Sequence, residues 1–173
     1  SVVYRIERVN GISIDISNPG DLPHANEVAA ITEPIILATI HVPAEHIGPV
    51  VKLTTERRGR QRDMRYIGDK RVVLEYEIPL SEIIYDFFDR LKTVTRGYGS
   101  LDYEFMEFRA ADLVKLDVLV HREPVDALSL IVHKQSAYER GKSLVAKLSK
   151  LIPRQQFDVP IQAAIGTKVI SRE

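Results

Sequence analysis

The residues most able to bind a charged partner are arginines gathered in one short stretch. Residues 57–71 hold seven basic and two acidic side chains, although the 173-residue chain carries no net charge. A guanidinium presents paired N–H donors that match the oxygens of a phosphate. The stretch therefore predicts contact with a phosphate backbone through four arginines: Arg57, Arg58, Arg60 and Arg62. The alternative is a solvated sheet edge whose charges discourage aggregation.

A second basic region lies later in the sequence. Residues 119–173 hold nine basic and five acidic side chains, whereas residues 1–56 and 72–118 are acidic overall. Several of these cations fall on a predicted helix, with Tyr138 nearby as a ring that could stack on a base. The candidates for RNA contact here are Arg140, Lys142, Lys147 and Arg154. Scattered solvated charge is again the alternative.

Residues that would support catalysis or metal binding do not converge in the sequence. Gly141-Lys142-Ser143 matches the end of a phosphate-binding loop, but Ser136 stands where that loop needs its first glycine. His41 and His46 have no third or fourth ligand nearby, and the chain has no cysteine. We therefore predict no catalytic residue, no metal and no cofactor in this chain, and no enzyme activity of its own.

The basic stretch belongs to a predicted unit of alternating strands and helices. A continuous apolar run at residues 35–42 predicts a central strand, and residues 45–58 predict an amphipathic helix that ends at Gly59. Residues 60–67 and 70–78 then predict a hairpin. The arginine stretch is therefore expected at the end of a helix and along the adjacent strand.

A second helix and a strand complete this unit. Pro79 predicts the start of the helix, whose apolar side chains recur at helical spacing: Leu80, Ile83, Ile84, Phe87, Phe88 and Leu91. Gly97 and Gly99 end it, and residues 101–105 alternate apolar and acidic side chains, which predicts a half-buried strand. The order β-α-β-β-α-β predicts an α+β fold of the ferredoxin-like split βαβ class.

The flanking segments predict smaller pieces. Residues 1–17 predict a hairpin around Asn10-Gly11. Beyond the ferredoxin-like unit we predict strands at 111–120, 125–132, 157–165 and 167–171 and a helix at 136–151. We therefore divide the chain into residues 1–32, the end of an upstream domain, residues 33–118, the ferredoxin-like domain, and residues 119–173, a smaller α/β unit that is cut short.

Several motifs, in order along the chain, resemble a known family. Arg57-Arg58-Gly59, Pro79-Leu80-Ser81-Glu82 and Leu91-Lys-Thr-Val-Thr-Arg-Gly-Tyr-Gly-Ser100 resemble the last domain of elongation factor G and its relatives. Asp112-Leu-Val-Lys-Leu-Asp-Val-Leu-Val120 and Val159-Pro-Ile-Gln-Ala-Ala-Ile-Gly166 are similar to the domain special to the elongation factor 4 (LepA) family. The resemblance covers essentially the whole chain.

The resemblance implies a C-terminal fragment of a ribosome-associated translational GTPase that acts in protein synthesis, in tRNA back-translocation or rescue of stalled ribosomes. Residues 33–118 would be its elongation-factor-G-like domain, beside ribosomal RNA and proteins near the GTPase-associated centre. Residues 119–173 would be the LepA-specific domain, which reaches toward tRNA. GTP and Mg²⁺ would bind a G domain absent from this chain.

The resemblance does not say which basic residues touch RNA. Our hypothesis assigns Arg57, Arg58, Arg60 and Arg62 to ribosomal RNA, and the second set, headed by Arg140, to tRNA or nearby RNA. A monomer in the cytoplasm is expected, and peripheral association of the intact factor with the cytoplasmic side of the membrane is left open. The alternative from another class is a stand-alone ferredoxin-like regulatory domain that binds a small ligand or associates with itself. Such a domain would need a pocket at a sheet edge, and its ligand would raise the melting temperature.

Overall fold

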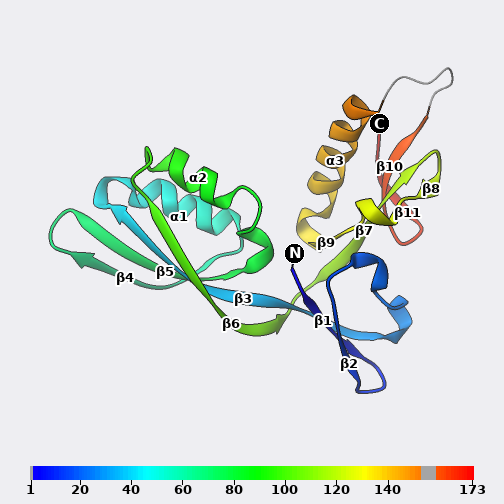
Figure 1. Ribbon diagram of the computed structural model, residues 1–173, viewed down its shortest axis with the longest axis horizontal. Helices are drawn as coiled ribbons and strands as arrows, with labels where there is room; N and C mark the ends of the chain where they lie inside the picture. The colour runs from blue at the N-terminus through cyan, green and yellow to red at the C-terminus, as the bar shows by residue number, and fades with distance from the viewer. Residues whose placement is uncertain (1, 153–158) are drawn as a thin grey trace. The chain divides into compact units, whose positions relative to one another are not determined.

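The computed structural model describes residues 2–152 and 159–173, and these form two compact units (Figure 1). The first unit contains residues 2–4 and 32–109, and the second contains residues 5–31 and 110–173. Strands β1 (Tyr4–Arg8) and β3 (Val28–Pro43) each contribute residues to both. Residues 5–31 thus lie in the same compact unit as residues 110–173, and their assignment to an upstream domain stays a prediction.

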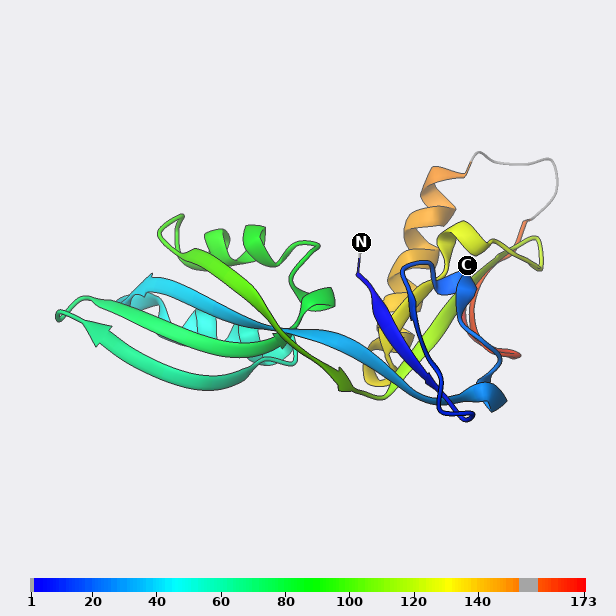
Figure 2. The same cartoon turned by 60° about the horizontal axis from the view of Figure 1, so that its bottom comes forward.

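The first unit has the ferredoxin-like element order. It contains β3, α1 (Ile47–Glu56), β4 (Arg60–Ile67), β5 (Arg71–Pro79), α2 (Phe87–Val94) and β6 (Ser100–Ala110). The strands lie in the order β4-β5-β3-β6, with β5 antiparallel to both β3 and β4. Figure 1 shows both helices on one side of this sheet, and Figure 2 shows β4 and β5 as a long hairpin. The predicted fold class is therefore confirmed.

Alternation along the two central strands builds the core of this unit. In β3 the side chains of Ile36, Ala38, Ile40 and Val42 are buried, and in β5 those of Leu74 and Tyr76 are buried. Side chains two apart share a face of a strand, so both strands present one apolar face to the helices. Val50 and Leu53 of α1 and Phe87 and Leu91 of α2 cover that face.

The second helix begins later than predicted. Pro79 ends β5, Leu80–Glu82 forms a 3₁₀ turn, and the helix starts only at Phe87. Of the predicted apolar stripe, Ile84 and Phe88 are 39% and 49% exposed. The turn is held from outside the segment, because the carbonyl of Glu82 accepts a hydrogen bond from the Arg57 side chain. A side chain 25 residues away thus binds a carbonyl that a continuous helix would pair locally.

The prediction of a half-buried strand after Gly99 is also wrong in part. β6 does form, but Tyr103 and Phe105 are 53% and 59% exposed, and only Leu101 packs against the core. β6 pairs with β3 and has no other neighbour among the strands that the structure describes. An edge strand that outruns its covering helix leaves its apolar side chains exposed.

The second unit places one helix on a small antiparallel sheet. The unit contains the end of β1, β2 (Ser13–Ile16), β7 (Leu113–Val120), β8 (Glu123–Pro124), β9 (Leu130–His133), α3 (Ala137–Leu151), β10 (Ile161–Ile165) and β11 (Lys168–Arg172). Of these, β1 and β2 are not part of the small sheet. The strands lie in the order β11-β10-β7-β8, and β9 also pairs with β7. Leu116, Val145 and Ala163 lie in the core between α3 and the sheet.

Three predictions for this unit need correction. Residues 125–132 are not one strand, because a 3₁₀ turn at Asp126–Leu128 precedes β9. The last predicted strand pair forms around Gly166, but β10 begins at Ile161, and residues 157–158 lie outside the described residues. The strand predicted at 111–120 begins only at Leu113. None of the helices in the described ranges is long and apolar enough to span a membrane.

Candidate nucleic-acid interface

The predicted RNA-binding arginines begin at the C-terminal end of α1, where the backbone turns out of the helix. The amide of Arg58 donates to the carbonyl of Thr55 (3.3 Å), and the amide of Gly59 donates to that of Thr54 (2.8 Å). These two bonds define a Schellman motif, which needs a left-handed residue after the helix cap. Arg58 takes that conformation with φ 59°. The sequence predicted Gly59 there instead.

Gly59 has a different role from the predicted one. A Cβ at this position would stand 2.7 Å from the carbonyl oxygen of Thr54, closer than real Cβ contacts allow. The glycine is therefore needed because the chain passes close to the helix it has just left. The tight turn carries the chain from α1 straight into β4.

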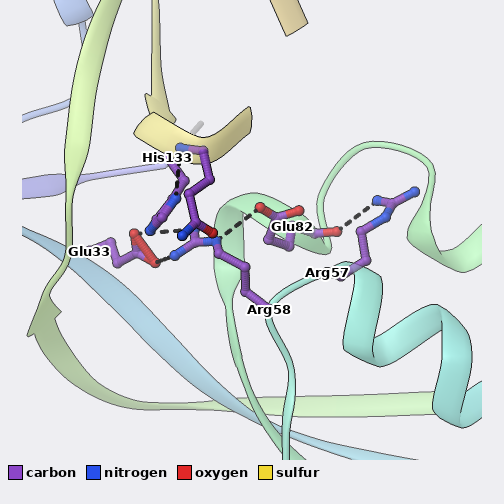
Figure 3. A network of polar contacts seen from close by, with 6 residues as sticks. Glu33, Arg57, Arg58, Glu82 and His133 are labelled. Carbon is purple, nitrogen blue, oxygen red and sulfur yellow. Dashed lines mark hydrogen bonds and ion pairs between the residues drawn. The ribbon is translucent and has the colours of Figure 1, made fainter. Parts of the chain in front are cut away.

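The guanidiniums of Arg57 and Arg58 are occupied within the first unit (Figure 3). Arg57 donates to the Glu82 carbonyl (3.2 Å) and to the Asp86 carboxylate (2.7 Å). Arg58 lies 2.9 Å from Glu33 and 3.3 Å from Glu82, both measured between guanidinium nitrogen and carboxylate oxygen. The Glu33 side chain is 1% exposed. The two arginines therefore connect α1 to β3 and to the segment before α2.

These contacts change the acidity of the neighbouring groups. The hydrogen bond from Arg57 holds the pKa of Asp86 below its usual value. Burial, followed by the negative charge of Glu33, raises the pKa of Tyr4 to about 12. A phenol beside a buried carboxylate resists ionisation because a second negative charge would be desolvated there. The network is thus built around neutral Tyr4 and the charged pair of Glu33 and Arg58.

The next arginines lie on β4, whose residues are all exposed. A bulge between Gln61 and Asp63 shifts the register, while Arg60 lies opposite Glu77 on β5. The Arg62 side chain comes 3.9 Å from Glu77, so Arg60 and Arg62 share the face of the sheet that the helices leave open. Within the described ranges, the guanidinium of Arg60 makes no hydrogen bond or ion pair.

That open face also carries acidic groups. Arg65 lies 3.1 Å from Asp63 and 3.4 Å from Glu75, and Arg109 hydrogen-bonds Glu77 at 2.6 Å. The hydrogen bond from Arg109 lowers the pKa of Glu77. Cations and anions alternate across this face. Among the arginines of β4, Arg65 has two carboxylates within ion-pair distance, Arg62 has Glu77, and Arg60 has none among the described residues. Arg60 and Arg62 therefore present the most available positive charge of the predicted set.

The second predicted set lies on α3 and is split by the turn of the helix. Lys142 and Lys147 are exposed, Arg140 is half-buried, and Arg154 lies outside the described residues. A helix turns by about 100° per residue, so Arg140 and Lys147 share one side and Lys142 lies roughly 200° away. Gly141 packs against the sheet, since a Cβ there would stand 3.0 Å from the Ala163 Cβ. The structure thus brings two of these residues together and separates the third.

Three basic residues that the sequence did not single out have unusual backbone geometry. Arg96, His121 and Arg122 have φ values of 52°, 54° and 64°, and all three are exposed. The available signal was weak: the sequence places Arg96 before Gly97 at the end of an apolar helix, where a left-handed residue is common. No local pattern marked the pair at 121–122.

An open depression of about 920 Å³ lies within the second unit. It is lined by residues 20–25, 27–31 and 111–115 together with Arg8, Asp117, Ile165 and Gly166. Its charged lining holds four acidic side chains, Asp21, Glu27, Asp112 and Asp117, and two basic ones, Arg8 and Lys115. No group of three or more metal-ligating side chains converges in the part of the chain that the structure describes.

Comparison with known proteins covers both units. The sequence profile of the elongation factor G C-terminus matches residues 30–119, and that of the GTP-binding protein LepA C-terminus matches residues 120–173. Elongation factor 4 from Alkaliphilus oremlandii is 54% identical over 173 residues, which are 100% of this chain and 29% of that protein. Elongation factor 4 from Geobacillus thermodenitrificans is 54% identical over 172 residues, 99% of this chain and 28% of that protein.

The chain therefore spans less than a third of the length of these relatives. The match to a crystal structure of a Thermus thermophilus protein covers 47% of this chain and 12% of that one. The TM-score is 0.44 at 29% sequence identity, a similarity too partial to define the fold.

Proposed function

The chain belongs to the elongation factor 4 (LepA) family, in the C-terminal region related to elongation factor G, and from this we propose that it docks a translational GTPase on the ribosome. The observation that carries the docking role is the exposed pair of arginines at the β4 edge of the open sheet face. Arg60 and Arg62 lie on one face beside the bulge, and Arg60 has no carboxylate within ion-pair distance among the described residues. Such a pair suits a phosphate backbone.

The four predicted arginines would then have two roles. Arg57 and Arg58 bind Glu82, Asp86 and Glu33, and so hold the end of α1 and the start of β4 in place. Arg60 and Arg62, carried on that fixed strand, contact phosphates of ribosomal RNA. Arg57 and Arg58 reach RNA only if their carboxylate partners release them, which makes them the weaker contacts of the set.

The second unit would contact a different part of the RNA. Arg140 and Lys147 share one side of α3 and suit a single phosphate strand, and Arg154 follows in the sequence. We assign this side to tRNA or to RNA beside it. Lys142, on the other side of α3, serves a separate contact.

The activity of the whole factor is part of the same proposal. A G domain elsewhere in the factor would bind GTP and Mg²⁺ and hydrolyse GTP, and the present chain would position that domain by holding RNA. The step assisted would be tRNA back-translocation or rescue of stalled ribosomes. The factor would work in the cytoplasm, and peripheral membrane association belongs to the intact factor.

Co-sedimentation of the 173-residue chain with ribosomes over a salt series tests the docking role. The double variant Arg60→Ala/Arg62→Ala should pellet more weakly. The slope of its log affinity against log salt concentration should be shallower, by the amount expected for the loss of roughly two phosphate contacts. A matched control is Lys52→Ala/Arg90→Ala, which removes the same charge from exposed positions of α1 and α2 in the same unit. If both double variants lose the same affinity for ribosomes, the binding depends on overall charge and not on Arg60 and Arg62. If the unmodified chain does not pellet with ribosomes at low salt, the docking role is refuted.

A further inference from the structure

All the non-glycine residues with left-handed backbone in the described ranges are basic. They are Arg58, Arg96, His121 and Arg122, with φ between 52° and 64°. This conformation crowds the Cβ of an L-residue, and glycine or asparagine adopts it at lower cost. Strain of this kind points to a role for the side chain, since glycine or asparagine could adopt the same backbone conformation with less strain.

For Arg58 the role of the side chain is visible. Its guanidinium reaches Glu33 and Glu82, and the buried Glu33 carboxylate needs a cation. The strain at Arg58 is therefore offset by contacts within the same unit. The remaining question is whether the other left-handed basic residues also have a partner for their side chains.

Arg96 is the counterpart of Arg58 at the end of α2. The amide of Arg96 donates to the Thr93 carbonyl (3.4 Å), and that of Gly97 donates to the Lys92 carbonyl (2.7 Å), the same Schellman pair as at the end of α1. Yet Arg96 is exposed, and its guanidinium makes no hydrogen bond or ion pair with any residue that the structure describes. The same strained geometry thus has an internal partner at one helix end and none at the other.

Hydrogen bonds of the buried Thr95 side chain and backbone hold the loop that carries Arg96 in place. Buried Thr95 donates its hydroxyl to the Leu91 carbonyl (2.7 Å) and accepts from the amide of Gly99 (2.8 Å). The amide of Tyr98 donates to the Thr95 carbonyl (3.0 Å), and a Cβ on Gly99 would stand 2.8 Å from the Thr95 hydroxyl. A loop held this way loses little conformational freedom when its exposed side chains bind a partner.

The side chains on this loop combine a cation with an aromatic ring. Tyr98 is 66% exposed, two residues from Arg96. Lys92 lies in the last turn of α2, where its ammonium donates to the Gly97 carbonyl (3.3 Å) and sits 5.4 Å from the Phe88 ring centroid. Figure 1 shows this segment at the junction of α2 and β6. We call residues 96–98 the α2 tip.

We propose that the α2 tip is a preformed RNA contact, in which Arg96 binds a backbone phosphate and Tyr98 stacks on an unpaired base. This inference rests on the proposed docking function and adds a site that the arginine stretch did not contain. RNA fits better than an acidic protein surface, because an exposed tyrosine ring beside an arginine offers a stacking face for a base. The backbone strain at Arg96 is then offset only in the complex.

The variant Arg96→Asn tests the tip without disturbing the fold, because asparagine accepts left-handed backbone. It should bind ribosomes roughly fivefold to tenfold more weakly. The slope of log affinity against log salt concentration should become shallower, by the amount expected for the loss of roughly one phosphate contact. Its denaturation midpoint should not fall, so that lost binding cannot be ascribed to unfolding. The matched control is Arg90→Ala, an exposed arginine of α2 with ordinary backbone, which should change affinity less than about twofold.

The outcomes separate this inference from the proposed function. If the unmodified chain pellets with ribosomes and Arg96→Asn pellets equally well, or if Arg90→Ala loses as much, the tip is not a contact although docking stands. If the unmodified chain does not pellet at low salt, both proposals fall. Binding to deproteinised ribosomal RNA should show the same loss for Arg96→Asn; a loss seen only with whole ribosomes would assign the tip to an acidic protein and overturn the RNA contact.

Discussion

The guanidinium of Arg58 lies 2.9 Å from the carboxylate of Glu33, a side chain that is 1% exposed. Arg58 holds this position from a left-handed backbone at the end of α1, and Glu33 holds it from β3, 25 residues earlier. A buried carboxylate is expensive unless a cation and hydrogen bonds compensate it. The pair thus ties the first helix to the central strand and fixes where β4 begins.

Replacing Arg58 with glycine should therefore destabilise the chain despite relieving the backbone. Removing one partner of a buried ion pair costs about 3–5 kcal/mol, and relief of a left-handed residue returns about 1–2 kcal/mol. We expect a net loss of about 2 kcal/mol in the free energy of unfolding, measured with urea at pH 7. Arg96→Gly is the matched control, because Arg96 has the same Schellman geometry and no internal partner among the described residues, and it should gain stability. A gain in both variants would contradict the structural role of the Arg58–Glu33 pair.

The acidity of Tyr4 predicts a loss of stability in alkali. Its pKa is about 12 in the folded chain and about 10 when unfolded, so the folded state keeps a proton that the unfolded state loses. This contribution is complete below pH 10 and is lost as pH rises toward 12. Relative to Tyr4→Phe, which cannot ionise, unfolding free energy should fall by about 2 kcal/mol between roughly pH 9 and pH 11.5. If the unfolding free energies of the two proteins change with pH in parallel, burial does not raise the pKa of Tyr4.

Two glycines at opposite ends of α1 should respond to alanine to different extents. Gly59→Ala would place a Cβ 2.7 Å from the Thr54 carbonyl oxygen and should destabilise by about 2 kcal/mol or more. Gly48, in the first turn of α1, meets no atom within 4 Å apart from its chain neighbours, so the main cost of Gly48→Ala is crowding by the following Pro49, and its loss should be smaller than that of Gly59→Ala. Denaturation midpoints of the two variants check this directly. A neutral Gly59→Ala would show that the turn can move aside.

The sequence was sufficient for the central strands and the fold class, because β3 and β5 have strong apolar patterns that local physics converts into a buried face. It was insufficient where distant residues decide. In the segment before α2, the Glu82 carbonyl accepts a hydrogen bond from Arg57, 25 residues away, and no local sequence window contains that contact. The alternation at Tyr103 and Phe105 predicts a strand correctly but cannot reveal whether anything covers it.

The same limit applies to the candidate site. Clustered arginines predicted a phosphate contact, but they could not reveal that Arg57 and Arg58 have carboxylate partners while Arg60 has none in the described ranges. Left-handed arginines were also hidden, because sequence rules assign that backbone to glycine first. Those rules assigned to Gly59 the role that Arg58 takes.

The turn between β7 and β8 allows a last test of backbone strain. His121 and Arg122 are its two central residues, since Val120 pairs with Glu123, and both have positive φ. A two-residue turn of this type favours Asn-Gly. His121→Asn/Arg122→Gly should therefore raise the free energy of unfolding by about 1–2 kcal/mol. The control His121→Ala/Arg122→Ala removes the same side chains without relieving the backbone and should bring no gain. Equal stability of the two variants would show that the left-handed pair carries no strain.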